Sequence, residues 1–553
     1  MKYTIGIDFG SLSGRALLVS VDDGREIAES VYEYPHAVCD RFVPDTNIPL
    51  GDNFALQHPR DYIDVLSNAI PDVMAKAGIG ADDIVGIGID FTSCTMLPVF
   101  ADGTPVCFDE RFSRDAHAYV KLWKHHASQS AATQINELAK ERGEEWISRY
   151  GNFIDSEWFF PKLLETAQKS PAVYDAADYF LDAGDWIVWQ LTGSQARSYP
   201  FAAYKAMYNL ENGFPSKEYF KALDPKIENV VEEKLVNELL PIGSLAGGLC
   251  ERMAGLTGLR VGTPVATAFL DAYAAIPAIG AVHDGDMLAV MGTSMPMLLV
   301  SSENKRVPGI CGVMKDGMVP GLYGYEAGIC CMGDHFAWFT ENCVPDSYKQ
   351  EAKAKGISVI AYLTEKAEAL AVGESGLIAL DWWNGNRSTL IDADLSGLFV
   401  GLTLSTRPEE MYRALIEATA FEAKHIIENY RRHGVNVGDF IACGGISHKN
   451  TFLMQIYADV LGMEIKTVES TQTPARGSAI LGALAAGVYP DYVSASEAMK
   501  SPVRDIYRPD PAKTTVYNEL FAEYEKLYDY FGRGENNVMK KLRTIRRDAK
   551  KGN

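Results

Sequence analysis

Near the start of the chain, two strand-like apolar runs flank a short turn of small polar residues. The first run begins at Tyr3 and reaches Asp8 and Phe9, and the second ends at Val21. The pattern predicts a β-hairpin with a glycine-containing turn. Backbone N–H groups of such a turn, with the hydroxyls of Ser11 and Ser13, can approach phosphate groups, and Asp8 can hold a hydrated metal ion. An ordinary hairpin is the alternative interpretation.

The same pattern returns at residues 286–300, where two apolar runs flank a Gly/Thr/Ser turn. Two later strand-like runs, 84–90 and 440–443, also lead into small or polar residues. Each half of the chain thus repeats a hairpin followed by a later strand. We therefore expect two related α/β domains with a nucleotide between them. The turn of the second hairpin consists of Gly292, Thr293 and Ser294. The two later strands lead into Ser93 and Cys94 and into Gly444 and Gly445.

Helical spacing of apolar residues predicts several helices between these strands. At 179–193 a strand leads into a short helix that ends at Gly193. Beyond Pro511 one apolar stripe is predicted to pack against the body of the protein. The basic residues 540–551 are interpreted as a solvated helix end rather than a nucleic-acid arm. The predicted helices are 60–77, 116–139, 156–169, 409–432 and 450–461, and the stripe is Tyr517, Phe521, Tyr524 and Tyr528.

The length of the chain requires more than one hydrophobic core. It has 553 residues, of which 47% are hydrophobic, and chains of this length divide into domains. Gly280 to Gly285 is the predicted boundary. We expect an N-terminal domain at 1–282, a nucleotide-binding C-terminal domain at 283–490 and a helical extension at 491–553.

Composition and charge restrict the class of partner. A formal net charge of −21 argues against nucleic acid, because a phosphate backbone needs a basic surface. The nine cysteines include no C-x-x-C pair, so reduced thiols and a cytoplasmic location are expected. No secretory signal and no apolar run of about 18 residues occurs, so no membrane partner is expected. No H-E-x-x-H motif occurs, and no structural zinc is expected.

Asp271 is the leading candidate for acid–base chemistry. It follows a strand-like run and precedes an alanine-rich helical segment, so its carboxylate is expected at a helix N-terminus. There it can cap the helix, or it can accept a proton from a hydroxyl that attacks the γ-phosphate of ATP. Both roles are compatible in a sugar kinase.

The motifs, taken in order, resemble the FGGY carbohydrate kinases, members of the actin/hexokinase/Hsp70 superfamily. They are Asp8-x-Gly10-Ser11-x-Ser13-x-Arg15, Asp271 ahead of its helix, the 292–294 turn and Gly444-Gly445 followed by Asn450. The resemblance extends over residues 3–490. It implies two ribonuclease H-like (actin-like ATPase) domains with an interdomain cleft, and ATP with Mg²⁺ as cofactors. It implies Mg²⁺ binding through water by Asp8 and Asp271, and ATP or phosphate binding by Gly10, Ser11, Ser13, Arg15, Gly292, Thr293, Ser294, Gly444, Gly445 and Asn450.

Other segments resemble the ribulokinase branch of that family, among them 90–95, 122–126, 326–328, 333–339 and 379–385. This resemblance implies an ATP:ketopentose 5-phosphotransferase that acts on O5 of L-ribulose in L-arabinose catabolism, with Asp271 as the general base. It also implies sugar contacts from Ser93, Cys94, Lys205, Asp271 and Glu326. From the residues alone, Lys205 is interpreted as a surface lysine and Cys94 as a small buried side chain.

Two alternatives remain open at this stage. One is a kinase for D-ribulose, ribitol or another pentulose or pentitol, because epimers differ only in the direction of one hydroxyl. The other is an ATPase binding module of the same superfamily with no small acceptor. The expected partners are a small-molecule sugar and ATP, and a homodimer is also considered.

Overall fold

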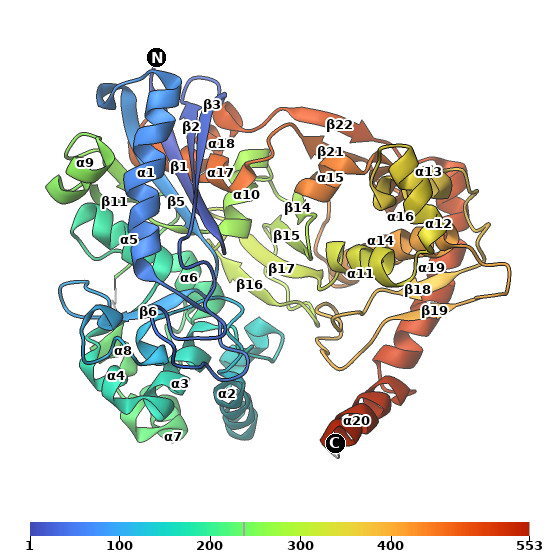
Figure 1. The fold of residues 1–553 in the computed structure, drawn as a ribbon, viewed down its shortest axis with the longest axis horizontal. Helices are drawn as coiled ribbons and strands as arrows, with labels where there is room; N and C mark the ends of the chain where they lie inside the picture. Colours follow the sequence, from blue (N-terminus) through green and yellow to red (C-terminus); the bar gives the residue numbers. More distant parts are fainter. Residues whose placement is uncertain (236–237, 552–553) are drawn as a thin grey trace. The chain divides into compact units, whose positions relative to one another are not determined.

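The computed structural model describes residues 1–235 and 238–551 (Figure 1). The chain forms two compact units. Unit 1 comprises Met1–Val282, Val313–Gly324 and Gln472–Ser501, and unit 2 comprises His283–Gly312, Tyr325–Thr471 and Pro502–Asn553. The packing therefore places two segments of the predicted 283–490 stretch with the N-terminal unit. The division of the sequence into three successive stretches remains a prediction.

A seven-stranded sheet forms the core of unit 1. Its order is β11-β12-β5-β1-β2-β3, and β13 also pairs with β5. Strands β1 and β2 form the predicted antiparallel hairpin, and β1, β12 and β13 all run parallel to β5. The strands are β1 (Tyr3–Phe9), β2 (Ser13–Ser20), β3 (Glu26–Glu33), β5 (Ile84–Phe91), β11 (Leu245–Gly248), β12 (Pro264–Ala266) and β13 (Phe269–Leu270).

Helices pack on this sheet at close range. α1 (Pro59–Ala77) contacts β2 and β3, and α17 (Thr473–Ala485) contacts β1, β5 and α10 (Asp271–Ile279). Glycines in the strands permit the approach of α17. A Cβ at Gly6 would lie 1.7 Å from the carbonyl oxygen of Ala475, and one at Gly88 would lie 1.7 Å from that of Ser478. Only glycine allows a strand and a helix backbone to come this close.

The other elements of unit 1 confirm most of the predicted helices. α1 matches 60–77, α3 matches 156–169, and β8 followed by α5 matches 179–193, with Gly193 as the C-cap. The elements are α2 (Gln129–Arg142), α3 (Phe159–Lys169), α4 (Pro171–Ala176), α5 (Ala183–Thr192), α6 (Tyr199–Lys205), α7 (Lys217–Leu223), α8 (Val230–Lys234), α9 (Glu251–Thr257), α18 (Tyr492–Met499), β4 (Leu56–Gln57), β6 (Met96–Val99), β7 (Val120–Lys121) and β8 (Tyr179–Asp182).

The predicted helix at 116–139 is wrong over its first half. Only α2 is an α-helix there, because Val120 and Lys121 form β7, which pairs with β4 and β6. Lys121 is buried, and its Nζ lies 2.6 Å from a carboxylate oxygen of Glu165. Strand pairing and this buried ion pair outweigh the local helical spacing.

Unit 2 contains a second sheet with a related order. From β17 it runs β17-β15-β14-β20-β21-β22, with β14–β15 antiparallel and β14, β20 and β21 parallel. This order matches β3-β2-β1-β5-β12 of unit 1, which confirms the prediction of two related α/β folds. The strands are β14 (Met287–Val290), β15 (Met295–Ser301), β17 (Tyr323–Ile329), β20 (Phe440–Cys443), β21 (Ile465–Val468) and β22 (Val503–Tyr507).

The helices of unit 2 agree with the predicted ranges. α14 (Pro408–Arg432) and α16 (Thr451–Leu461) match the predictions at 409–432 and 450–461. All four residues of the apolar stripe on α19 (Pro511–Gly532) are buried, so its predicted packing is confirmed. The other elements are α11 (Gly333–Asn342), α12 (Asp346–Ala354), α13 (Val359–Glu368), α15 (Gly445–Lys449), α20 (Val538–Lys551), β18 (Ile378–Leu380) and β19 (Leu398–Val400).

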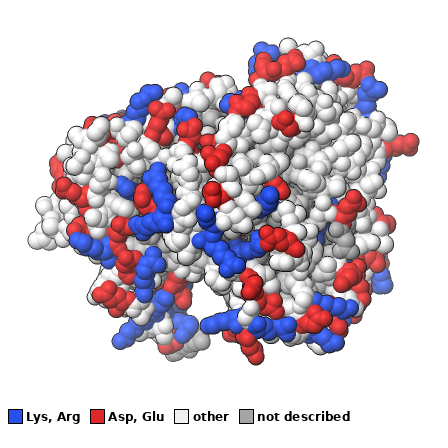
Figure 2. All heavy atoms as spheres, turned by 180° about the vertical axis from the view of Figure 1, so that it is seen from behind, with Lys and Arg blue, Asp and Glu red and all other residues white. Residues whose placement is uncertain are grey.

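Charged side chains of both signs are interspersed over the visible face in Figure 2. Within the described parts of the chain, no helix has both the length and the apolar character needed to cross a bilayer.

Candidate active site

The turn of the β1–β2 hairpin is held by backbone and side-chain hydrogen bonds. Within the turn, the N–H of Gly10 donates to the carbonyl oxygen of Ser13 at 3.0 Å. The N–H of Tyr34, which follows β3, donates to the carbonyl oxygen of Leu12 at 2.9 Å. The loop after β3 therefore supports the turn from outside the hairpin.

Two further side chains of unit 1 fix Ser11. The Nε2 of Gln57 donates to the carbonyl oxygen of Ser11 at 2.9 Å, and the indole Nε1 of Trp123 donates to its hydroxyl at 3.0 Å. Arg15 extends from β2, with its Nη1 donating to Gln472 Oε1 at 2.6 Å and lying 3.9 Å from Asp8 Oδ2. The turn and its neighbours thus form a fixed polar surface of the kind that binds phosphate.

Three carboxylates lie at one edge of the sheet in unit 1. Asp8 on β1 is paired in register with Asp90 on β5, and Phe269 on β13 is paired with the same Asp90. Asp271 follows β13 directly and begins α10. Because the three strands are parallel, their carboxyl ends meet at the same edge. The sequence pattern did not assign a role to Asp90, although its strand ends in a carboxylate as β1 does.

Asp8 and Asp90 influence each other's pKa. Burial raises the pKa of Asp90 well above its usual range, and the nearby charge of Asp8 raises it further. Burial also raises the pKa of Asp8, while a hydrogen bond from Asp90 and the charge of Arg15 oppose that rise. The hydroxyl of Ser478 on α17 donates to Asp90 Oδ2 at 2.6 Å. The rise in pKa is therefore stronger for Asp90 than for Asp8, which favours a proton on Asp90 and negative charge on Asp8.

The pKa of the Asp271 carboxylate is shifted toward neutral pH. Loss of hydration raises its pKa to about 7, and the negative charge of Asp8 contributes to the rise. The backbone N–H groups of Ala272 and Ser93 and the positive charge of Lys205 act in the opposite direction. Oδ1 accepts a hydrogen bond from the N–H of Ala272 at 2.7 Å. The carboxylate therefore contacts its own helix start and remains a proton acceptor.

Lys205, at the end of α6, interacts electrostatically with both Asp271 and Cys94. It is buried, and its Nζ lies 5.3 Å from the ring centroid of Trp158. A buried ammonium next to a carboxylate is not a surface lysine, so the alternative interpretation of Lys205 is excluded.

Cys94 lies in a constrained backbone position. Its φ of 61° is in the left-handed region, which residues other than glycine rarely occupy. The buried Lys162 donates to its carbonyl oxygen at 2.7 Å. Burial raises the pKa of the Cys94 thiol to about 12, so the thiol is neutral near pH 7 and is not a reactive thiolate.

The β14–β15 turn of unit 2 is organised in the same way as the first hairpin. The N–H of Gly292 donates to the carbonyl oxygen of Ser294 at 3.0 Å. The segment that leads into α11 caps the turn, since the N–H of Met332 donates to Thr293 at 2.8 Å and that of Gly333 to Gly292 at 3.0 Å. The polar turn is therefore anchored on one side by backbone hydrogen bonds.

The glycine pair after β20 differs in the space around its two members. Gly444 has a φ of 95°, and a Cβ there would lie 2.6 Å from the carbonyl oxygen of Met291, whereas a Cβ at Gly445 would meet nothing within 4 Å. Packing against Met291 therefore requires glycine at position 444, whereas the space beside Gly445 is open. Asn450 caps α16, because its Oδ1 accepts from the N–H of Leu453 at 2.9 Å and its Nδ2 donates to the Tyr412 hydroxyl at 3.2 Å.

Glu326 lies within β17 of unit 2 and is partly buried. Its carbonyl oxygen accepts from the N–H of Cys311 at 2.8 Å, and its negative charge contributes to the raised pKa of Tyr430.

The predicted site residues thus form two sets, each described within its own unit. Unit 1 contains Asp8, Gly10, Ser11, Ser13, Arg15, Ser93, Cys94, Lys205 and Asp271, and unit 2 contains Gly292, Thr293, Ser294, Glu326, Gly444, Gly445 and Asn450.

Comparisons with known proteins cover nearly the whole chain. The N-terminal domain model of the FGGY family of carbohydrate kinases matches residues 3–278, and the C-terminal domain model of that family matches residues 287–486. The chain is 48% identical over 553 residues to a ribulokinase of Geobacillus thermodenitrificans, covering 99% of this chain and 98% of that protein. It is 45% identical over 551 residues to a ribulokinase of Mycolicibacterium smegmatis, covering 100% and 97%.

Solved structures share the fold at lower identity. A ligand-bound xylulose kinase from Lactobacillus acidophilus matches with a TM-score of 0.78 at 19% identity, covering 96% of this chain and 98% of that one. A Plasmodium falciparum glycerol kinase with ADP matches with a TM-score of 0.76 at 17% identity, covering 96% and 98%. Both domain models and the near full-length relatives lead to one conclusion: the chain belongs to the FGGY family of carbohydrate kinases.

Proposed function

We propose that this protein transfers the γ-phosphoryl group of ATP to O5 of L-ribulose, giving L-ribulose 5-phosphate and ADP in cytoplasmic L-arabinose catabolism. The observation that carries the proposal is Asp271, a carboxylate whose pKa of about 7 suits a general base. The ketopentose substrate is supported by the relatives at 45–49% identity that are ribulokinases.

In the proposed reaction, Asp271 accepts the proton of the C5 hydroxyl as O5 forms a bond to the γ-phosphorus. The bond between that phosphorus and the bridging oxygen breaks, and its electron pair leaves with ADP. Lys205 lies close enough to Asp271 to lower its pKa, so it can donate a hydrogen bond to a neighbouring sugar hydroxyl while it keeps the base ionised. The neutral thiol of Cys94 contributes to the shape of the sugar pocket.

The phosphate-binding roles are assigned to the two hairpin turns. Backbone N–H groups and hydroxyls at Ser11, Ser13, Thr293 and Ser294 would bind phosphate oxygens, and the open space at Gly445 would admit the nucleotide. The side chain of Asn450 caps α16. We therefore assign the nucleotide contact to the start of α16 rather than to the Asn450 side chain itself.

Asp8 and Asp271 fit Mg²⁺, because both offer carboxylate oxygens and the negative charge of Asp8 raises the pKa of Asp271. Asp8 and Asp271 would hold the ion, in part through water. When bound, Mg²⁺ neutralises charge on the transferring phosphoryl group.

The position of phosphorylation tests the proposal directly. The product of L-ribulose and ATP would be isolated and its carbon–phosphorus couplings measured by ¹³C NMR. Coupling at C5 is the expected result. Coupling at another carbon would leave a sugar kinase and exclude the O5 assignment, and failure to consume L-ribulose would favour another pentulose or pentitol.

The pKa of Asp271 predicts the pH dependence of the reaction. The base acts only when it is deprotonated, so kcat/KM for sugar should fall about tenfold per pH unit below pH 7 and level off above it. The measurement is a pH profile at saturating Mg-ATP. A profile with no acidic limb between pH 5.5 and about 7.5 would contradict the assignment of Asp271.

Replacement of Lys205 by methionine should weaken sugar binding. Loss of a charged hydrogen bond costs about 1.5–3 kcal/mol, so KM for the sugar should rise about 10- to 150-fold while KM for ATP stays unchanged. Because Lys205 lowers the pKa of Asp271, the acidic limb of the variant should also move to higher pH.

Lys226→Met is a matched control, because Lys226 Nζ likewise lies over an aromatic ring, 5.7 Å from the centroid of Tyr174. Equal effects of the two substitutions would show that Lys205 has no specific role at the sugar.

A further inference from the structure

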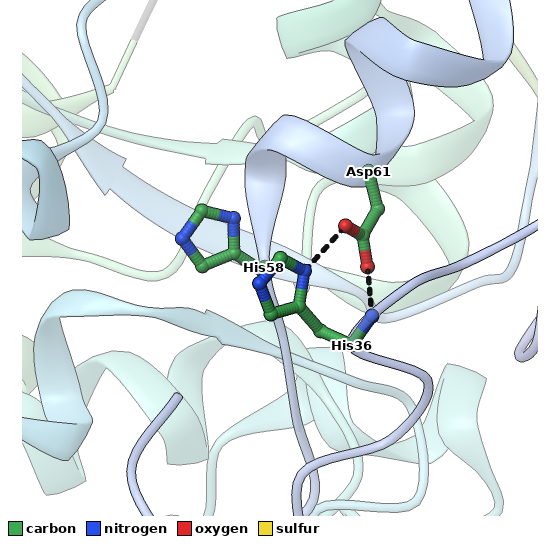
Figure 3. Close-up of side chains that lie close together, drawn as sticks. All are labelled: His36, His58 and Asp61. Atoms are coloured by element: carbon green, nitrogen blue, oxygen red, sulfur yellow. Dashed lines mark hydrogen bonds and ion pairs between the residues drawn. The ribbon is translucent and has the colours of Figure 1, made fainter. Parts of the chain in front are cut away.

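A second group of metal-binding side chains lies in unit 1, separate from the three carboxylates of the proposed active site. It contains His36 from the loop after β3, and His58 and Asp61 from the start of α1 (Figure 3). One ligand-capable atom of each residue lies within 4.8 Å of those of the other two. No motif in the sequence indicates this group, because 22 positions separate the two histidines.

The two imidazole rings are stacked and have the same orientation. Their centroids lie 4.3 Å apart with an interplanar angle of 20°. The Nδ1 of His36 lies 2.6 Å from Asp61 Oδ1, and the Nδ1 of His58 accepts from the N–H of Arg60 at 3.2 Å. The Nε2 atoms lie 3.2 Å and 3.7 Å from the carboxylate oxygens of Asp45. Both Nδ1 atoms therefore lie on the side of α1, and both Nε2 atoms face one carboxylate.

This arrangement has the two shells of a typical metal site. Ligating histidines usually donate their other ring N–H to a carboxylate, which fixes the tautomer and the ring orientation. Asp45 is placed to accept from the Nε2–H of His36 at 3.2 Å, whereas the Nε2 of His58 faces the same carboxylate at 3.7 Å, beyond hydrogen-bond distance. The two Nδ1 atoms are therefore the candidate ligands beside the Asp61 carboxylate.

Burial favours a cation at this place. The side chain of Asp61 is 1% exposed and that of His58 6%, whereas that of His36 is 23% exposed and leaves a route for an ion. A buried carboxylate is costly unless it is paired or coordinates a metal.

We propose that His36, His58 and Asp61 bind a divalent transition-metal ion, of which Zn²⁺ is the best match, with Asp45 as the outer carboxylate. Two imidazoles and a carboxylate are characteristic of zinc, whereas Mg²⁺ and Ca²⁺ prefer oxygen ligands alone. Binding requires His58 to exchange its hydrogen bond from Arg60 for the metal, and His36 to carry its proton on Nε2, facing Asp45.

The proposed metal site would connect the two segments that support the turn of the β1–β2 hairpin. Tyr34, two residues before His36, donates to Leu12, and Gln57, immediately before His58, donates to Ser11. An ion that ties His36 to His58 would therefore stabilise the turn from both sides. The proposal concerns metal binding and stability, so it can be tested independently of the sugar substrate.

The test is titration of the chelator-treated full-length protein with Zn²⁺ by calorimetry, in excess Mg²⁺, together with the metal content after dialysis and the melting temperature. We expect one bound Zn²⁺ per chain and a higher melting temperature. His36→Gln and His58→Asn should each weaken binding by at least about 100-fold, and Asp45→Asn by about 10- to 100-fold. Asparagine is a good N-cap residue, so His58→Asn removes the ligand and keeps the start of α1.

The matched control is His126→Gln. His126, Asp155 and Glu157 also lie within 4.8 Å of one another, but the side chain of His126 is 47% exposed. This substitution should leave Zn²⁺ binding unchanged. Absence of Zn²⁺ binding by the wild type, or unchanged affinity in His36→Gln and His58→Asn, would overturn the proposal, as would loss of binding in His126→Gln alone.

Discussion

Asp271→Asn is expected to lower kcat for sugar phosphorylation by about 100- to 10,000-fold, the usual contribution of a positioned general base. Asparagine keeps the size of the side chain and can accept the hydrogen bond from Ala272, but it cannot take the hydroxyl proton. Sugar affinity, measured by calorimetry without ATP, should therefore stay within about tenfold of the wild type. The acidic limb near pH 7 should also disappear from any residual activity.

Asp52→Asn is the matched control, since Asp52 is an exposed carboxylate of the same unit. It should leave kcat and its pH profile unchanged. Near-normal kcat in Asp271→Asn would exclude Asp271 as the base and leave it as a helix-start residue.

Gly88→Ala is expected to reduce the stability of unit 1 by at least about 3 kcal/mol, because overpacking against backbone cannot be relieved by a rotamer change. A Cβ there would lie 1.7 Å from the carbonyl oxygen of Ser478 and 2.9 Å from the N–H nitrogen of Gly482. β5 and α17 would have to separate, and Asp90 and Ser478, which are hydrogen-bonded at 2.6 Å, lie on these two elements. The measurement is the melting temperature by calorimetry, with the yield of folded protein.

Gly80→Ala is the control for Gly88→Ala. Gly80 has a φ of −100°, and a Cβ there would meet nothing within 4 Å, so its effect should stay within about 0.5 kcal/mol. Equal melting temperatures for the two variants would show that α17 does not pack on β5 as described.

Elements with a local signature could be predicted from the sequence. The hairpin at Tyr3–Ser20 and the strand–helix unit ending at Gly193 depend on alternation, turn residues and caps within a few positions. The repeat of the hairpin in both halves then indicated two related folds. These signals require no knowledge of which distant segments pack together.

Features that depend on distant pairing could not be predicted. α17 lies more than 380 residues after β5 in the sequence, yet its backbone packs against the glycines of that strand. The same distance concealed the contact of Ser478 with Asp90 and thereby the role of Asp90 beside Asp8. The strand at Val120–Lys121 was missed for a similar reason, since its partners are β4, β6 and Glu165.

The same distinction between local sequence signals and distant packing applies to the residues of the candidate site. Asp8 and Asp271 could be selected as candidates because each carboxylate lies at the end of a strand-like run or directly after it. The buried state of Lys205 and the capping role of Asn450 could not, because both depend on tertiary surroundings. The expectation that the histidines form no metal site rested on sequence spacing, which cannot detect the approach of His36 to His58.

The central claim is that an ATP-dependent kinase of this family prefers L-ribulose, and coupled ADP release with Mg-ATP tests it most directly. The panel contains L-ribulose, D-ribulose, L- and D-xylulose, ribitol, glycerol and a reaction without sugar. We expect the highest kcat/KM on L-ribulose and little ADP release without sugar. Preference for another polyol would contradict the substrate assignment, and ADP release that is independent of every sugar would contradict the kinase function itself.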